Sequence, residues 1–82
     1  KALEKARVVS IDPAVGLLVL DAGRSTGVRI GTPVAILRGE KPIYSAMIVD
    51  VREGISGALL QNRLDEKLEA SVGDRVRVLP DR

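Results

Sequence analysis

The stretch whose spacing comes closest to a chemical motif is Gly23-Arg24-Ser25-Thr26-Gly27. Glycines around hydroxyl residues are typical of a loop that cradles phosphate. Such a loop ends in Gly-Lys-Ser/Thr and runs into a helix, so that backbone N–H groups and the helix terminus face the anion. This stretch has no lysine, and a β-like run follows it. The spacing therefore favours a tight loop that uses glycine for positive φ, rather than a phosphate site.

The acidic and hydroxyl residues form no clear catalytic group. The carboxylates are scattered, and most of the following fall in expected turns, where Asp bonds its own backbone: Asp12, Asp21, Asp50, Asp65, Glu66 and Asp74. The adjacent Asp65 and Glu66 leave a weak calcium site open as an alternative. The chain has no His and no Cys, so the commonest general base and the soft metal ligands are missing. A Ser–Lys dyad stays formally possible. We expect no catalytic residue, metal site or cofactor, no small-molecule substrate, and no enzymatic activity.

Cationic residues gather around two expected loops and suggest an interaction patch. We predict that this patch comprises Arg24, Arg29, Arg38, Lys41 and Tyr44. A basic, loop-borne patch attracts an anionic partner. The alternative is that these residues belong to ordinary solvated turns. Arg75 and Arg77 alternate along the last strand, where they are expected on its outward face and protect it from edge-to-edge pairing.

Composition limits the function classes. The chain has 82 residues, a net charge of +2 and a single aromatic residue, Tyr44. So few aromatics argue against base stacking on single-stranded nucleic acid, and the low charge argues against non-specific duplex binding. No stretch is long and apolar enough to span a membrane, and no signal peptide is recognised. A membrane link is therefore expected only through a segment outside this sequence.

Alternating and β-branched runs predict six strands in one domain. The runs are Arg7–Ile11, Leu17–Leu20, Pro33–Leu37, Ile43–Val51, Ala58–Leu60 and Arg75–Leu79. In the longest run, Met47, Val49 and Val51 are expected on one side, with Ala46, Ile48 and Asp50 on the other. Between the last two runs, the polar stretch Asn62–Ala70 could form one helical turn, since Leu64 and Leu68 stand four apart.

The chain repeats itself. Val8–Ile11 matches Ile48–Val51 at an offset of 40, and Ile30–Leu37 matches Val72–Leu79 at an offset of 42. Each copy contains a glycine turn, at Gly31 and at Gly73, followed by an alternating strand. Val34, Ile36, Val76 and Val78 are expected to fill one core from opposite sides. At two equivalent positions the copies differ: the first has Pro33 and Ala35 where the second has Arg75 and Arg77. Positions that differ between the copies are better candidates for functional residues than positions that repeat.

We therefore predict an all-β fold, a small closed or partly open six-stranded barrel with an internal pseudo-two-fold repeat and a short helical N-terminus. Residues 1–6 are expected to end a helix or coiled-coil stalk, because they are good helix formers without a breaker. A frayed terminus is the alternative. Residues 7–79 form the single barrel domain, and residues 80–82 form a C-terminal tail. An SH3-like fold without true duplication also stays open.

From Ser25-Thr26-Gly27-Val28-Arg29-Ile30-Gly31-Thr32-Pro33-Val34-Ala35-Ile36 through Ile48-Val49-Asp50-Val51 to Val72-Gly73-Asp74-Arg75-Val76, the chain resembles a known group. It resembles the SH3-like and MreC-like β-domains that follow a coiled coil in bacterial cell-envelope proteins. The resemblance implies a non-catalytic structural or protein-interaction module in the periplasm or cell envelope. It also implies a protein partner, or self-association through an upstream helix. The Val-Gly-Asp-Arg-Val phrase also occurs in nucleic-acid-binding cradle-loop and KOW/SH3-like barrels, which is the alternative function.

Overall fold

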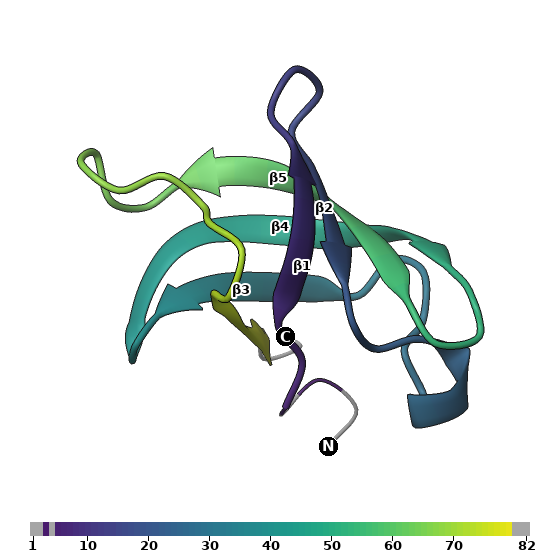
Figure 1. Cartoon of the computed structure of the whole chain (residues 1–82). Helices are drawn as coiled ribbons and strands as arrows, with labels where there is room; N and C mark the ends of the chain where they lie inside the picture. Colours follow the sequence, from purple (N-terminus) through teal and green to yellow (C-terminus); the bar gives the residue numbers. More distant parts are fainter. Residues whose placement is uncertain (1–2, 4, 80–82) are drawn as a thin grey trace.

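The computed structural model describes residue 3 and residues 5–79. In this part of the chain, six strands form one antiparallel sheet in the order β1-β2-β5-β4-β3-β6 (Figure 1). The strands are β1 (Val8–Asp12), β2 (Leu17–Leu20), β3 (Pro33–Arg38), β4 (Lys41–Val51), β5 (Ser56–Arg63) and β6 (Arg75–Val78). A short 3-10 helix, η1 (Arg24–Thr26), connects β2 to β3. The predicted all-β fold with six strands is confirmed.

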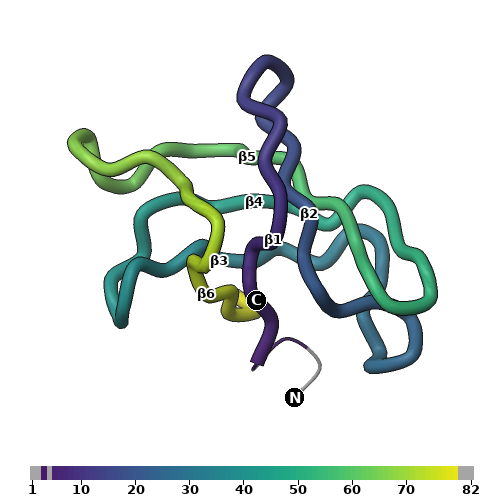
Figure 2. The backbone as a smooth tube through the Cα atoms, viewed as in Figure 1, coloured from purple at the N-terminus to yellow at the C-terminus, as the bar shows by residue number. Residues whose placement is uncertain are grey.

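The sheet curls into an open half-barrel. Its two edge strands, β1 and β6, lie side by side near the start of β1 (Figure 2). They meet at a single isolated antiparallel bridge between Arg7 and Arg75. Of the two outcomes that the sequence left open, closed or partly open, the structure has the open one.

Strand register follows the internal repeat. Leu18 pairs with Ala58, which is its own repeat equivalent at an offset of 40 (58 − 18). Ala35 pairs with Arg77, which is its equivalent at an offset of 42 (77 − 35). A residue pairs with its own equivalent when a two-fold axis passes through the pair. The β2–β5 and β3–β6 pairings thus both agree with a two-fold relation between the halves.

The turns at Gly31 and Gly73 connect the two halves of the chain through backbone hydrogen bonds. The Gly31 N–H donates to the Ile48 carbonyl at 2.7 Å, and the Gly73 N–H donates to the Val8 carbonyl at 2.8 Å. Ile48 is the equivalent of Val8, so each half inserts its glycine turn against the first strand of the other half. Both glycines adopt positive φ, at 90° and 96°, a region that side chains other than glycine rarely enter.

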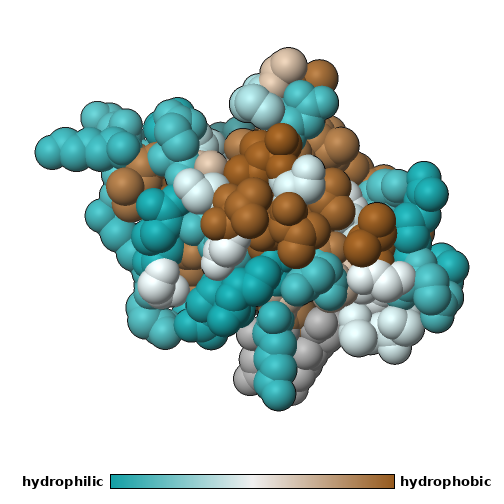
Figure 3. Space-filling model, in the orientation of Figure 1, coloured by the Kyte–Doolittle hydropathy of each residue, from teal (hydrophilic) through white to brown (hydrophobic). Residues whose placement is uncertain are grey.

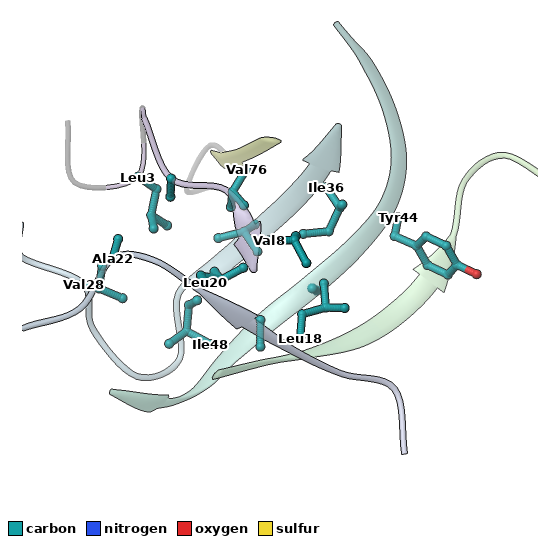
Figure 4. Close-up of a cluster of buried hydrophobic side chains, with 14 of the residues drawn as sticks. Leu3, Val8, Leu18, Leu20, Ala22, Val28, Ile36, Tyr44, Ile48 and Val76 are labelled. Atoms are coloured by element: carbon teal, nitrogen blue, oxygen red, sulfur yellow. The ribbon is translucent and has the colours of Figure 1, made fainter. Parts of the chain in front are cut away.

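The core is built from branched aliphatic side chains on the inner face of the sheet (Figure 4). Because side chains alternate along a strand, every second residue of a strand points inward. Leu18, Ala58 and Ile48 are cross-strand neighbours and are all fully buried. Tyr44, the single aromatic residue, lies at one end of this cluster with its ring edge outward. Aliphatic packing therefore replaces the aromatic contacts common in larger cores.

The predicted helical N-terminus is wrong for the described residues. Leu3 and Lys5 lie in a turn, and the Ala6 N–H donates to the Leu3 carbonyl at 3.2 Å. One turn of helix is too short to be stable alone. Leu3 and Ala6 are instead buried in the barrel core, in the places that Ile43 and Ala46 take at the offset of 40. Lys1, Ala2 and Glu4, and the expected tail of residues 80–82, lie outside the described residues.

Two irregularities overturn other details of the prediction. A β-bulge between Ile48 and Asp50 shifts the alternation of β4, so that Val51 turns back toward the core and Asp50 faces water. Bulges add an unpaired residue, and periodicity alone does not reveal them. Val78 is 42% exposed and does not fill the core as expected. The polar stretch after β5 holds a turn at residues 66–67 and no helix.

Candidate interaction surface

The predicted patch residues do not form one patch. Arg38, at the end of β3, and Lys41 and Tyr44, near the start of β4, lie around one end of the half-barrel. Arg24 lies in η1, and Arg29 lies in the loop that leads to the start of β3. In Figure 1 the η1 loop and the β3–β4 turn are at opposite sides of the molecule. The structure therefore divides the five residues into two groups.

The loop around η1 has its backbone donors occupied. The Arg24 N–H donates to the Arg52 carbonyl at 2.7 Å, and the Ser25 N–H donates to the Glu53 carbonyl at 3.0 Å. A Cβ on Gly23 would lie 2.3 Å from the Arg52 carbonyl oxygen, so only glycine permits this close approach. The loop thus packs on the β4–β5 hairpin. Its N–H groups are not arranged to cradle a phosphate.

The two cations beside that loop differ in their contacts. Arg24 forms an exposed ion pair with Glu53 at 3.6 Å. Arg29 is exposed and makes no ion pair with any residue that the structure describes. An exposed pair of this kind contributes little to stability.

Arg38 holds the connection between β5 and β6, which we call the strap (residues 64–74). Its Nε donates to Asp74 Oδ1 at 2.6 Å, and its Nη2 donates to Asp74 Oδ2 at 3.1 Å and to the Glu69 carbonyl at 2.6 Å. Asp74 is buried and also accepts the Ser71 N–H at 2.7 Å. The hydrogen bond with Asp74 raises the pKa of Arg38 above its ordinary value. This forked contact fixes the strap against β3.

Tyr44 anchors the middle of the strap. Its hydroxyl donates to Glu69 Oε1 at 3.2 Å, and the Arg63 guanidinium lies over its ring, 5.1 Å from the centroid. Arg63 also donates to Glu69 Oε2 at 2.6 Å. Burial, followed by the bond to Glu69, raises the pKa of Tyr44, while the bonds from Arg63 and then Tyr44 lower the pKa of Glu69. Tyr44 is thus a structural residue, with little surface left for a partner.

Lys41 forms an ion pair with Asp65 at the start of the strap. This contact, together with the Lys67 N–H, lowers the pKa of the Asp65 carboxyl. Asp65 is therefore already engaged by a cation, which argues against the calcium alternative. Among the described residues, no three His, Cys, Asp or Glu side chains come together as a metal site would require.

Sequence reasoning missed the acidic partners of this network, Glu69 and Asp74, and the cation Arg63. The contacts that Arg38 and Tyr44 make with Asp74 and Glu69 join residues 36 and 25 positions apart, so no local pattern predicts them, whereas Arg63 and Glu69 are only six positions apart. The one available signal was the longer, charged connection in the second copy of the repeat. Arg38, Lys41 and Tyr44 are therefore engaged in contacts that hold the strap.

An apolar row crosses the outer face of the sheet. Leu17 pairs with Leu59, Leu59 with Met47, and Met47 with Pro33. Their strand neighbours Leu18, Ala58, Ile48 and Val34 point into the core and are fully buried, so the row points the other way. Pro33 is exposed and the other three are half-buried. We call these four residues the outer row.

Two further apolar side chains reach the surface, one in the edge strand β1 and one in the inner strand β4. Val9 is 45% exposed and Val49 is 39% exposed. Figure 3, in the orientation of Figure 1, shows apolar side chains gathered over and beside β1, with hydrophilic side chains around them. Single exposed apolar residues are ordinary on a protein surface, whereas cross-strand neighbours such as those of the outer row are typical of a contact surface.

Comparison with known protein families, with curated proteins and with solved structures finds no match for this chain. Within the described part, no helix has the length and apolar character needed to cross a bilayer.

Proposed function

We propose that this chain is a non-catalytic β-barrel module that binds another protein through the outer row. The observation that carries the proposal is the cross-strand continuity of Leu17, Leu59, Met47 and Pro33. A sheet face in contact with water normally carries polar side chains, alternating with the apolar residues that face the core. Four apolar neighbours on that face are favourable when a second surface covers them.

The ion pairs within the molecule also support a protein partner, because they already engage several of its cations. Arg38, Lys41 and Arg63 are paired with carboxylates of the strap, and Arg24 is paired with Glu53. These pairs neutralise cations that a nucleic-acid surface would need. A protein partner therefore fits the surface better than the alternative, a nucleic-acid-binding cradle-loop or KOW/SH3-like barrel.

The resemblance to MreC-like and SH3-like domains extends the proposal to a setting. It favours a bacterial cell-envelope protein in which a coiled-coil stalk carries the module. Because Leu3 and Ala6 are part of the barrel core, such a stalk would have to end before Leu3. Association through an upstream helix would then place several modules side by side.

Photo-cross-linking in cells that express the whole protein tests the proposal. A photoreactive amino acid replaces Met47 in the outer row, and the control replaces Val15, which is 63% exposed in the β1–β2 turn. We expect discrete adducts with a protein from Met47 and none from Val15. Equal labelling from both positions, or no protein adduct from Met47, would contradict the proposal. Salt-sensitive binding of the purified protein to duplex DNA or structured RNA would favour the alternative.

A further inference from the structure

The outer edge of β6 lacks a strand neighbour in the described part of the chain. β6 pairs with β3 on one side, and on the other side only Arg75 bridges to Arg7. On the N-terminal side of Arg7, a turn closed by the hydrogen bond from the Ala6 N–H to the Leu3 carbonyl directs the chain away from β6. An unpaired strand edge presents N–H and C=O groups to which an extended peptide can add.

The internal repeat indicates what is missing there. The Arg75–Arg7 bridge is equivalent to the Pro33–Met47 pair, at offsets of 42 and 40. From Pro33, pairing between β3 and β4 continues as far as Arg38 and Lys41, whereas between β6 and β1 it stops at the bridge.

Among the described residues, no strand covers this edge, and an inward-facing side chain of β6 is left in water. Ile36 and Val78 are equivalents at the offset of 42 and point to the same inner side of the sheet. Tyr44 covers Ile36, which is fully buried, while Val78 is 42% exposed. An apolar side chain placed beside Val78 would remove this surface from water.

Cations line the outer side of the same edge. Arg75 and Arg77 point outward from β6, and Arg7 stands directly opposite Arg75. Like charges that face each other across two strands are unfavourable. Among the described residues, Arg75 pairs with Glu40 at 3.2 Å, and the Glu40 side chain is 85% exposed. Asp21 uses one carboxylate oxygen to accept the Arg7 backbone N–H at 2.7 Å.

The aliphatic parts of the Arg75 and Arg77 side chains cover apolar residues of β3, while their guanidinium groups do not take part in this packing. Arg75 lies across from Leu37, and Arg77 lies across from Ala35. Leu37 and Ala35 point outward, yet both are buried, as expected when long side chains lie over them. The stems cover apolar surface, and the guanidinium groups remain available at the edge.

Two other occupants fit this edge poorly. If β6 of a second copy paired antiparallel with β6, Arg77 would stand opposite Arg75 or Arg77, which is unfavourable. Nucleic acid would find a short cationic edge and no exposed aromatic residue, since Tyr44 is buried. An extended segment with carboxylates on one face and apolar residues on the other fits both the charge and the apolar surface.

We propose that the outer edge of β6 binds an extended acidic segment of a partner protein, which adds a strand to the half-barrel. Carboxylates of the segment bond to Arg75 and Arg77, and an apolar side chain packs on Val78. This inference rests on the proposed function in taking the partner to be a protein, but it concerns a different surface from the outer row.

The probe for this proposal is the capped peptide Asp-Val-Glu-Val-Asp-Val-Glu, in which carboxylates and valines alternate. A matched peptide carries lysine in place of every acidic residue. Binding is followed by two-dimensional amide NMR at low and at moderate salt. We expect the acidic peptide to shift the amide signals of Val76, Arg77 and Val78, with an affinity that falls as salt increases. The lysine peptide is expected not to bind.

The main variant is Arg75→Met with Arg77→Met, because methionine keeps much of the apolar stem that covers Leu37 and Ala35. We expect this variant to bind the acidic peptide at least about tenfold more weakly, since two charge-assisted contacts are lost. Arg29→Met, at an exposed position outside this edge, is the control and is expected to bind as the original protein does. Thermal melting establishes that each variant folds.

A charge-reversed variant keeps the test decisive if the double variant fails to fold. Arg77→Glu should reject the acidic peptide and bind the lysine peptide. Signal shifts away from β6, equal affinity of Arg75→Met/Arg77→Met, or tighter binding to a short DNA duplex would each overturn the inference. If the peptide experiment fails but Met47 still forms protein adducts in the cross-linking experiment, the proposed function stands and only the inference about β6 is overturned. If Met47 forms no adducts either, the proposed function fails as well.

Discussion

Gly73 donates its backbone N–H to the carbonyl of Val8 at 2.8 Å, and the same residue of β1 donates its own N–H to the Asp74 carbonyl at 2.9 Å. In the other half of the chain, Gly31 and Ile48 are joined in the same way, with the Ile48 N–H bonded to the Thr32 carbonyl at 3.0 Å. These paired bonds connect each glycine turn to the opposite half. They make the two halves one cooperative unit.

Replacement of the turn glycines tests this interlocking. Gly31→Ala and Gly73→Ala should each lower the free energy of unfolding by about 1–2 kcal/mol, because alanine is strained at positive φ. No atom lies within 4 Å of a Cβ built on either glycine, so backbone strain alone sets the cost. Urea denaturation measures it.

Gly54→Ala is the matched control, since Gly54 also has open space around it but is not at positive φ. Its effect should stay within about 0.5 kcal/mol. If Gly54→Ala were as destabilising as Gly31→Ala and Gly73→Ala, strain at positive φ would not be the reason for the loss of stability.

The strap depends on the buried carboxylate of Asp74. Asp74→Ala removes the acceptor of two Arg38 hydrogen bonds and of the Ser71 N–H. We expect a clear fall in the urea midpoint, because donors that were bonded are left without a partner. Glu40→Ala, which removes the exposed partner of Arg75, should leave the midpoint almost unchanged. Similar midpoints for the two variants would show that the strap is not held through Asp74.

Acid should weaken the attachment of the strap. The pKa of Glu69 is lowered in the folded protein, first by Arg63 and then by Tyr44, so the unfolded chain binds a proton more readily than the folded one. This stabilisation is complete above the ordinary glutamate pKa of about 4.3 and is lost as pH falls through the lower folded value. Asp65, paired with Lys41, acts in the same direction. Unfolding by urea as a function of pH should therefore show stability decreasing in acid.

Glu69→Gln is the variant that isolates this effect. It keeps the size of the side chain and removes the titrating group, so its stability should depend less on pH over the same range. The same loss of stability in acid for the variant and the original protein would rule out Glu69 as a source of the effect.

The two faces of the sheet should respond differently to truncation. Leu18 is fully buried, and Leu18→Ala should cost about 2–5 kcal/mol through lost contacts and the cavity left behind. Leu59 lies in the outer row and is half-buried, so Leu59→Ala should cost clearly less. Equal losses, measured by urea denaturation, would mean that the outer row is part of the folded core and not a free surface.

Much of the architecture could be predicted because it depends on local chemistry. β-branched runs gave the six strands within a few residues. The expected glycine turns at Gly31 and Gly73 do use positive φ. The repeat offsets identified equivalent residues, but only the structure shows that some equivalents pair with each other, as Leu18 does with Ala58 and Ala35 with Arg77.

The rest depends on contacts between distant parts of the chain. Helix propensity suggested a helical N-terminus, but burial of Leu3 and Ala6 in the core outweighs that weak local preference. Arg38 and Lys41 are strand neighbours, as their closeness in the sequence suggests, but their acidic partners lie on the strap, which sequence spacing alone does not bring near. The outer row likewise became visible only with the register of four strands.

Met47 offers the most direct test of the central claim, that the outer row is a protein-binding surface. It is the single methionine of the chain, so its oxidation reports on one place alone. Its rate of oxidation to the sulfoxide is measured in the purified protein and in the native assembly, by mass spectrometry. We expect Met47 to be oxidised readily in the purified protein and to be protected in the assembly. Equal rates in both would contradict it.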